Sequence, residues 1–262
     1  MGLEAAEVGL CAVLVDEAAA SSRPIPMLTA RWPEMTLSDA YTIQRASMAR
    51  RFERGERLVG MKMGLTSVAK MRQMGVHDPI YGHLTDAMRL EEGGSISRAA
   101  HCHPRAEPEI CFLLARDLEG PGVTPEQALE AVGEVFAALE IIDSRYEDFK
   151  FTLIDVVADN ASSSRFVLGQ GRGLSGLEID DLVMTMEING EVVERGSSSA
   201  IYDHPARSLA AQANMLAERG ERLLAGQVVM SGGATAAVAV KPGDRVRAVV
   251  EGIGAASFFV EP

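Results

Sequence analysis

Two glutamates separated by one residue, Glu107 and Glu109, stand at the start of an apolar run that continues through Ile110, Cys111 and Phe112. In an extended strand, residues two positions apart point to the same face, so these two carboxylates are expected to lie close together. Like charges that close repel each other unless solvent or a cation separates them. The pair therefore indicates either a hard divalent metal with oxygen ligands or two ordinary solvent-exposed glutamates at a strand end.

A third carboxylate, Glu140, lies within the apolar run of residues 138–142. An unpaired charge in a core would cost several kcal/mol, roughly, so Glu140 needs a partner. That partner is either a metal shared with the first two glutamates or an arginine such as Arg145. Mg²⁺ and Mn²⁺ take a few carboxylates and keep water or substrate oxygens in their remaining positions, which suits three glutamates.

Lys62 lies between Gly60 and Gly64 in residues 58–64, where apolar residues alternate with small or polar ones, as in a strand. Glycines on both sides leave room for a ligand or for another backbone. In a pocket near a metal, this lysine could donate a proton or stabilise an enolate, whereas a lone lysine is usually exposed to solvent.

Two further segments combine small and polar residues. Residues 155–164 place Asp155, Asn160 and Ser162 behind an apolar stretch, either as a loop cap or as a substrate-binding loop. Residues 231–235, which end in Thr235, form either a plain tight turn or a set of backbone N–H donors that hold a carboxylate.

Composition narrows the function further. With 262 residues, 47% of them hydrophobic, the chain can bury a substantial core. A net charge of −12 argues against nucleic acid as a partner. The three cysteines lack a C-x-x-C spacing, and no run is apolar enough to span a membrane. Acidic residues near the N-terminus exclude a signal peptide. We therefore expect a cytoplasmic protein. No serine-hydrolase elbow or phosphate-binding loop is present.

These residues need a scaffold, and the chain divides into a helical N-terminal region, residues 1–57, and a β-rich catalytic region, residues 58–262. The first region is expected to hold a helix over residues 2–20, a linker over residues 23–33, and a second helix from a capping box at Thr36 to Gly55. The second helix has an apolar stripe formed by Leu37, Tyr41, Met48 and Phe52.

In the second region, helices are expected at residues 67–74 (closed by Gly75), 124–137 and 205–219, with a loop over residues 79–82. Asn189-Gly190 predicts a hairpin. Strands are expected at residues 58–64, 109–114, 139–142, 183–188, 191–194, 227–230, 237–240, 245–251 and 256–260. Helices do not alternate regularly with strands, so the pattern favours an α+β fold over a doubly wound sheet.

Five sequence blocks in this order resemble the hydratase/decarboxylase branch of the fumarylacetoacetate hydrolase superfamily: residues 60–67, 104–112, 139–143, 155–162 and 233–237. The resemblance implies a mixed β-roll with a helical N-terminal region. It also implies Mg²⁺ or Mn²⁺ held by Glu107, Glu109 and Glu140, with Lys62 in the active site. Two activities share this scaffold in catechol meta-cleavage: hydration of 2-hydroxypenta-2,4-dienoate, and decarboxylation of 4-oxalocrotonate (2-oxo-3-hexenedioate).

The resemblance favours the decarboxylase, because residues 71–84 and 141–146 match that branch better. Hydratases of this family commonly carry an acidic residue after a proline, in a P-D-F-G pattern, and this chain has Ile80 there. An apolar side chain would protect a dienolate from water. Asp155, Asn160, Ser162 and Thr235 would then contact a small dicarboxylic 2-oxo acid.

The resemblance also implies a partner, namely the hydratase that consumes the product, and the chain could form a homo-oligomer. Three alternatives remain. The chain could itself be the hydratase, it could hydrolyse a carbon–carbon bond, or it could be a non-catalytic subunit that scaffolds a hydratase complex. Lys62 and the three carboxylates argue against the last alternative, and no histidine is positioned with a glutamate as in the hydrolases.

Overall fold

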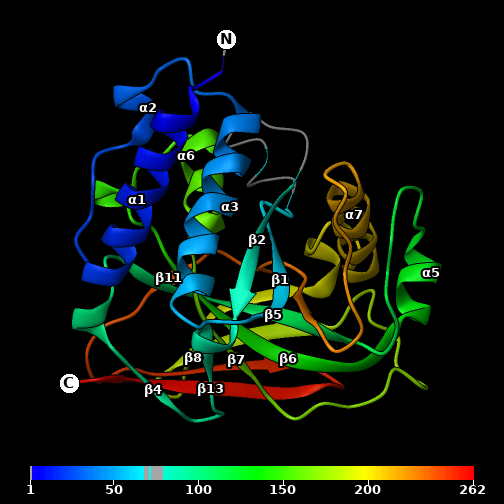
Figure 1. Cartoon of the computed structure of the whole chain (residues 1–262). Coiled ribbons are helices and arrows are strands. Elements are labelled where there is room, and N and C mark those ends of the chain that lie inside the picture. The colour runs from blue at the N-terminus through cyan, green and yellow to red at the C-terminus, as the bar shows by residue number, and fades with distance from the viewer. Residues whose placement is uncertain (1, 68–70, 72–78) are drawn as a thin grey trace.

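The computed structural model describes residues 2–67, 71 and 79–262 (Figure 1). The helix expected over residues 67–74, with Gly75 at its end, therefore lies almost entirely outside the described residues. No helix of the described residues is long and apolar enough to cross a membrane.

The N-terminal region is helical, as expected. The capping box at Thr36 is present: its hydroxyl accepts the Asp39 N–H, and the Asp39 carboxylate accepts the Thr36 N–H. Gly55, with φ of +99°, follows the end of that helix. The expected linker contains one short helical turn. The elements are α1 (Ala5–Ser21), α2 (Leu28–Arg31) and α3 (Leu37–Glu53).

The apolar stripe predicted for α3 is only half right. Tyr41 and Met48 are buried, but Leu37 and Phe52 are 41% and 38% exposed. Both exposed residues lie at the ends of the helix, whereas its middle packs against α1 and against α6 (Leu153–Ala158). Polar Gln44 is buried there, and its amide donates hydrogen bonds to the backbone carbonyls of Tyr81 and Val157 at 3.0 and 2.9 Å. This side chain ties the helical layer to the β-rich region.

The β-rich region is built from two sheets. The larger has the strand order β2-β1-β10-β5-β6-β7-β3, with β11 also paired to β5. Most neighbours in it are antiparallel, while β1 and β10 are parallel and β3 and β7 are parallel. Its strands are β1 (Leu58–Gly64), β2 (Ile80–Thr85), β3 (Arg89–Leu90), β5 (Pro104–Leu114), β6 (Val132–Asp143), β7 (Ser163–Leu168), β10 (Val228–Met230) and β11 (Val238–Ala239).

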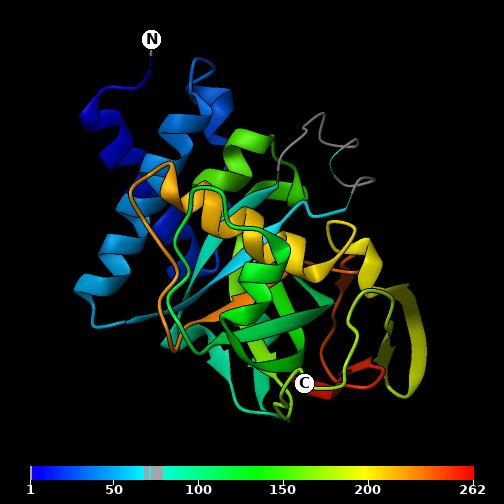
Figure 2. The same cartoon turned by 90° about the vertical axis from the view of Figure 1, so that its right-hand side faces the viewer.

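The second sheet has the order β4-β13-β12-β8-β9 and packs on β5 and β6 through β12 and β13. Figure 1 shows this sheet below the larger one, with α1, α2, α3 and α6 gathered above. Helices α5 (Pro125–Glu130) and α7 (Pro205–Ala217) pack against each other (Figure 2). The α+β mixed fold is confirmed. The strands of the second sheet are β4 (Ser95–Ser97), β8 (Val183–Ile188), β9 (Glu191–Ser197), β12 (Arg245–Val250) and β13 (Gly254–Glu261).

Three expected elements are wrong. The helix expected over residues 124–137 ends at Glu130, and the next residues begin the long strand β6, because Val135 and Phe136 are buried in the sheet. The loop expected over residues 79–82 is largely the start of β2, which pairs with β1. Residues 155–164 are not a loop but α6, a 3₁₀ turn over Asn160–Ser162, and the start of β7.

The last third follows the sequence closely. Asn189 and Gly190, with φ of +55° and +87°, form the turn between β8 and β9. The helix expected over residues 205–219 is α7, which begins at Pro205. Among the described residues, three strands of the structure, β3, β4 and β7, were not expected from the sequence.

Candidate metal centre

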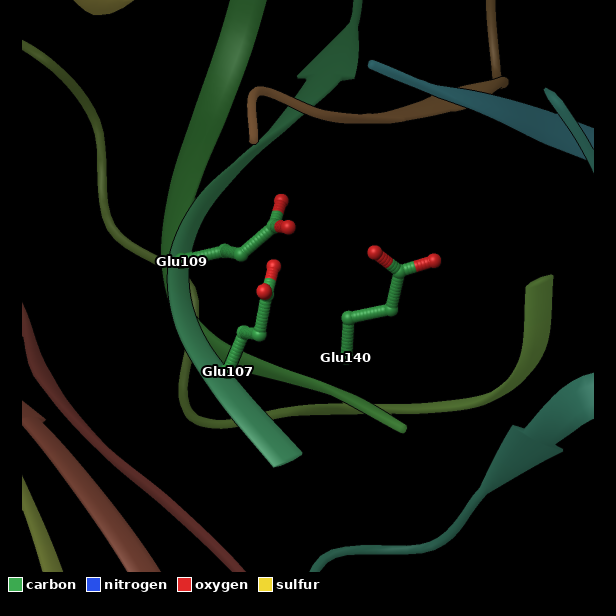
Figure 3. A group of neighbouring side chains, drawn as sticks. All are labelled: Glu107, Glu109 and Glu140. Atoms are coloured by element: carbon green, nitrogen blue, oxygen red, sulfur yellow. The ribbon is translucent and has the colours of Figure 1, made fainter. Parts of the chain in front are cut away.

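Glu107 and Glu140 lie directly opposite each other on the antiparallel strands β5 and β6, and Glu109 lies two residues further along β5 on the same face. One carboxylate oxygen of each residue lies within 4.8 Å of the other two. Figure 3 shows the three side chains pointing toward a common space. Glu107, Glu109 and Glu140 are only 7%, 0% and 1% exposed, respectively, so they are not ordinary surface glutamates.

Burial and mutual repulsion make this cluster unfavourable without a cation. Desolvation raises the pKa of Glu109 well above its usual value, and the charges of Glu140 and Glu107 raise it further. The pKa of Glu140 is also raised, mainly by desolvation and with a contribution from Glu107, against the opposing effect of Lys62. Like charges directly opposite each other destabilise a sheet.

The hydrogen bonds of Glu109 leave a ligand atom available. Its Oε2 accepts the backbone N–H of Gly232 at 2.8 Å, while its Oε1 is buried with no hydrogen-bond partner among the described residues. Buried carboxylate oxygens converging in this way are the donor set that a hard divalent cation such as Mg²⁺ prefers. The residues present therefore fit the metal that the sequence implied.

Lys62 is a cation of the described residues that contacts the cluster. Its ammonium nitrogen lies 3.0 and 3.1 Å from the two carboxylate oxygens of Glu140, and its side chain is 3% exposed. Arg145 pairs instead with Asp159, so Lys62 and not Arg145 is the partner of Glu140. This ion pair offsets part of the negative charge of Glu140.

The glycines that flank Lys62 serve two different purposes. A Cβ atom on Gly60 would lie 2.1 Å from the carbonyl oxygen of Val228, so this glycine admits the backbone of β10. A Cβ atom on Gly64 would lie 3.1 Å from Ile80 Cγ1 and 3.9 Å from the Lys62 ammonium nitrogen. Gly64 therefore leaves space for Ile80 beside Lys62, at the position where the sequence placed an apolar side chain.

A cavity of about 620 Å³ opens at this centre. Lys62 and Glu107 line it on the polar side, and Ile80 lines it on the apolar side together with Phe149 and Phe151. This volume is in the range of small-molecule sites. Ionic groups at one wall and apolar side chains around them suit a small anionic substrate that reacts out of contact with bulk water.

Besides Ile80, two of the expected substrate residues, Ser162 and Thr235, line this cavity. The hydroxyl oxygen of Ser162 is buried and has no hydrogen-bond partner among the described residues. Ser162 and the preceding Ala161 have φ of +57° and +50°, a left-handed backbone conformation that non-glycine residues rarely adopt. Thr235 lies on the cavity wall as well, and its hydroxyl donates to the carbonyl oxygen of Ala236 at 3.1 Å.

The other two expected substrate residues have roles inside the fold. The carboxylate of Asp155 accepts hydrogen bonds from the backbone N–H and hydroxyl groups of both Thr29 and Thr152, which caps α6 and fastens α2 to it. The carboxamide of Asn160 pairs with both backbone groups of His83, at 2.7 and 2.9 Å. Neither side chain lines the cavity. In a sequence, a polar residue that satisfies buried backbone groups looks the same as one that binds substrate.

The turn over residues 231–235 does hold a carboxylate, but that carboxylate belongs to Glu109. Gly232 has φ of +109°, and a Cβ atom there would lie 2.2 Å from the hydroxyl oxygen of Thr66. Only glycine fits this position, so the turn places a backbone donor against one of the three glutamates.

Several cavity residues were not expected from the sequence, among them Arg105 and Phe149. Arg105 lies on β5 two positions before Glu107, and its guanidinium carbon stacks 3.9 Å from the ring centroid of Phe149. The same alternation that paired Glu107 with Glu109 would have placed Arg105 on that face. Phe149 lies in an irregular segment after β6, and no periodicity marks it.

Known proteins resemble this chain in sequence and in fold. The fumarylacetoacetate (FAA) hydrolase C-terminal family matches residues 63–261. A 4-oxalocrotonate decarboxylase from Pseudomonas sp. is 52% identical over 93% of this chain and 94% of its own length. A 2-hydroxyhexa-2,4-dienoate hydratase from Comamonas testosteroni is 42% identical over 92% of each. The structure of 4-oxalocrotonate decarboxylase from Pseudomonas putida G7, complexed with magnesium and adipate, superposes with a TM-score of 0.96 at 44% identity, covering 98% of both chains.

Proposed function

The chain belongs to the fumarylacetoacetate hydrolase family, and on this basis we propose that it is a metal-dependent carboxy-lyase acting on 4-oxalocrotonate (2-oxo-3-hexenedioate). The product is 2-hydroxypenta-2,4-dienoate, an intermediate of catechol meta-cleavage. The observation that carries the proposal is the buried cluster of three carboxylates, joined by the Lys62 ion pair, beside a mainly apolar cavity. Relatives of similar length named for this reaction support it.

Glu107, Glu109 and Glu140 would hold Mg²⁺ or Mn²⁺, which when bound supplies a Lewis acid for the 2-oxo acid end of the substrate. In the reaction, the bond to the distal carboxylate breaks and CO₂ leaves. The electron pair moves through the carbon–carbon double bond to the 2-oxo oxygen. Lys62 stabilises the negative charge that develops on that oxygen or transfers the proton that makes the enol.

The apolar side of the cavity favours the same outcome. Ile80 is 4% exposed and stands beside Lys62, so water has little room next to the developing dienolate. An apolar surround also favours neutral CO₂ over a carboxylate. Ser162 and Thr235 would orient the substrate through hydrogen bonds.

The deciding experiment is metal-dependent release of CO₂. Purified protein with 2-oxo-3-hexenedioate and Mg²⁺ is expected to release CO₂ and form the dienol, followed by NMR. Excess EDTA should lower the rate by about 100-fold or more, because the Lewis acid supplies several kcal/mol of transition-state stabilisation. Restoring Mg²⁺ should restore the rate.

The hydratase alternative rests on the relative from Comamonas testosteroni and predicts different products. A hydratase would add water to 2-hydroxypenta-2,4-dienoate and release no CO₂ from 2-oxo-3-hexenedioate. That result would overturn the decarboxylase proposal while leaving the metal centre intact.

We further propose a cytoplasmic protein that associates with the hydratase consuming its product. All three cysteines, Cys11, Cys102 and Cys111, are free and buried, as is usual in a reducing compartment. Co-expression with that hydratase should give one species of larger mass in sedimentation velocity than either protein alone. Two independent species would contradict the association, and the mass of this chain alone would reveal a homo-oligomer.

A further inference from the structure

Arg105 is a cavity-lining cation that the proposed reaction has not used. Arg105, Glu107 and Glu109 alternate along β5, so their side chains emerge on one face in that order. Residues two apart in a strand are about 6.8 Å apart along its axis. Arg105 therefore emerges beyond Glu107, on the side away from Glu109. The residue paired with it on β6, Ile142, lines the same cavity.

The guanidinium of Arg105 is held in place by an aromatic ring. Its carbon lies 3.9 Å from the ring centroid of Phe149, and the Phe149 ring packs against Phe151 with centroids 5.3 Å apart. No carboxylate of the described residues forms an ion pair with it. Stacking on a ring leaves the edge of a guanidinium, with its planar N–H donors, available to an anion.

The rise between the Arg105 and Glu107 positions along β5 is close to the length of a ligand with two anionic ends. A six-carbon dicarboxylate has five carbon–carbon bonds of roughly 1.5 Å, so its carboxyl carbons lie roughly 6 Å apart when extended. That length is close to the spacing between Glu107 and Arg105 along the strand. The apolar residues Ile142 and Phe151 line the cavity together with these groups and suit the carbon chain.

We propose that Arg105 binds the distal carboxylate of the substrate and so selects dicarboxylic over monocarboxylic 2-oxo acids. The inference rests on the proposed function, because it assumes that the 2-oxo acid end lies at the three glutamates. Arginine binds carboxylates through two parallel hydrogen bonds, which makes the contact directional. The product has lost this carboxylate and therefore loses the contact, so Arg105 distinguishes substrate from product.

A matched pair of unreactive ligands tests the proposal. 2-Oxohexanedioate and 2-oxohexanoate differ only in the distal carboxylate, and neither has the double bond that the reaction needs. Isothermal titration at saturating Mg²⁺ should show wild-type protein binding the diacid roughly 10- to 100-fold more tightly. Arg105→Gln should abolish this preference and leave the affinity for 2-oxohexanoate within about twofold. Arg105→Lys should keep part of the preference, because it retains the charge but not the planar fork.

Arg247→Gln is the matched control, since it removes an exposed arginine of β12 in the other sheet and should leave both affinities unchanged. Equal binding of the two ligands by wild-type protein, or an unchanged preference in Arg105→Gln, would overturn the proposal. An equal loss for both ligands in Arg105→Gln would assign Arg105 a structural role and overturn it as well. Because no turnover is measured, absence of CO₂ release would refute the proposed reaction separately.

Discussion

Glu109→Gln is expected to abolish Mg²⁺ binding and to lower decarboxylation to the metal-free rate. Glu109 is fully buried beside the other two carboxylates, and its Oε1 has no hydrogen-bond partner among the described residues. Glutamine has nearly the same shape, and its amide oxygen can still accept the N–H of Gly232. The substitution therefore removes one negative charge and one ligand atom while keeping the packing.

In the absence of metal, Glu109→Gln should not harm the protein, because its effect there is on stability and not on metal binding. Without a cation, desolvation and the charges of Glu140 and Glu107 act against an ionised Glu109, so the neutral amide should keep or raise the free energy of unfolding. Wild-type protein should gain about 2.7 kcal/mol when Mg²⁺ is present at 100 times its dissociation constant. Glu109→Gln should gain almost nothing. Urea unfolding with and without Mg²⁺ measures both effects.

Glu134→Gln provides the control, because Glu134 is an exposed glutamate of the same strand as Glu140. It should keep both the metal response and the activity. If Glu109→Gln retained the full stabilisation by Mg²⁺, the metal would have to bind elsewhere. If it lost metal-free stability by several kcal/mol, the carboxylate would serve the fold and not the metal.

The sequence predicts those contacts of the metal centre that join residues close together in the chain or on neighbouring strands. Glu107 and Glu109 are two residues apart in one strand, so their common direction follows from alternation alone. Their pairing with Glu140 depends only on the neighbouring strand, which is next in the larger sheet. Family resemblance was needed to decide between a metal and surface exposure, since spacing alone allowed both.

The partner of Glu140 could not be predicted from spacing. Lys62 lies on β1, and β10, which comes from more than 160 residues later in the chain, is inserted between β1 and β5. Arg145 is closer to Glu140 in sequence, but its guanidinium turns to Asp159 and to the carbonyl oxygens of Asp143 and Ser163. A buried charge demands a partner, but only the sheet order decides which residue supplies it.

Errors in the elements have a similar origin. The sequence of residues 132–137 is compatible with a continuation of helix α5. Burial of these residues in the sheet, as part of β6, overrides that local helical preference. The family resemblance alone placed Asp155 at the substrate, whereas its polar neighbours also allowed a loop cap. The Thr152-Asp155 capping box is itself visible in the sequence and predicts the start of α6. Asn160 gave no such signal, because its partner His83 is 77 residues away.

Lys62→Met is the second change with a large expected effect, and it should act on catalysis more than on metal binding. The ammonium group is 3.0 Å from Glu140 and 3% exposed, so methionine leaves no positive charge at this buried position of the cavity. Losing a buried charge that stabilises the transition state typically costs about 10²–10⁴ in rate. We expect kcat to fall by that factor at saturating Mg²⁺, with Lys241→Met, an exposed lysine, as the unaffected control.

The two substitutions should change the metal-free free energy of unfolding in different directions: Lys62→Met should lower it, whereas Glu109→Gln should keep or raise it. Removing Lys62 leaves Glu140 buried and unpaired, which should lower the metal-free free energy of unfolding by about 3–5 kcal/mol. Mg²⁺ should recover most of that loss, because the cation takes over the neutralisation of Glu140. Glu109→Gln relieves the repulsion among the three carboxylates but cannot bind the metal. Lys62→Met increases that repulsion but can still bind the metal. A Lys62→Met protein that stays near wild-type in rate, or whose loss of stability persists in Mg²⁺, would show that the ion pair belongs to the fold and not to the reaction.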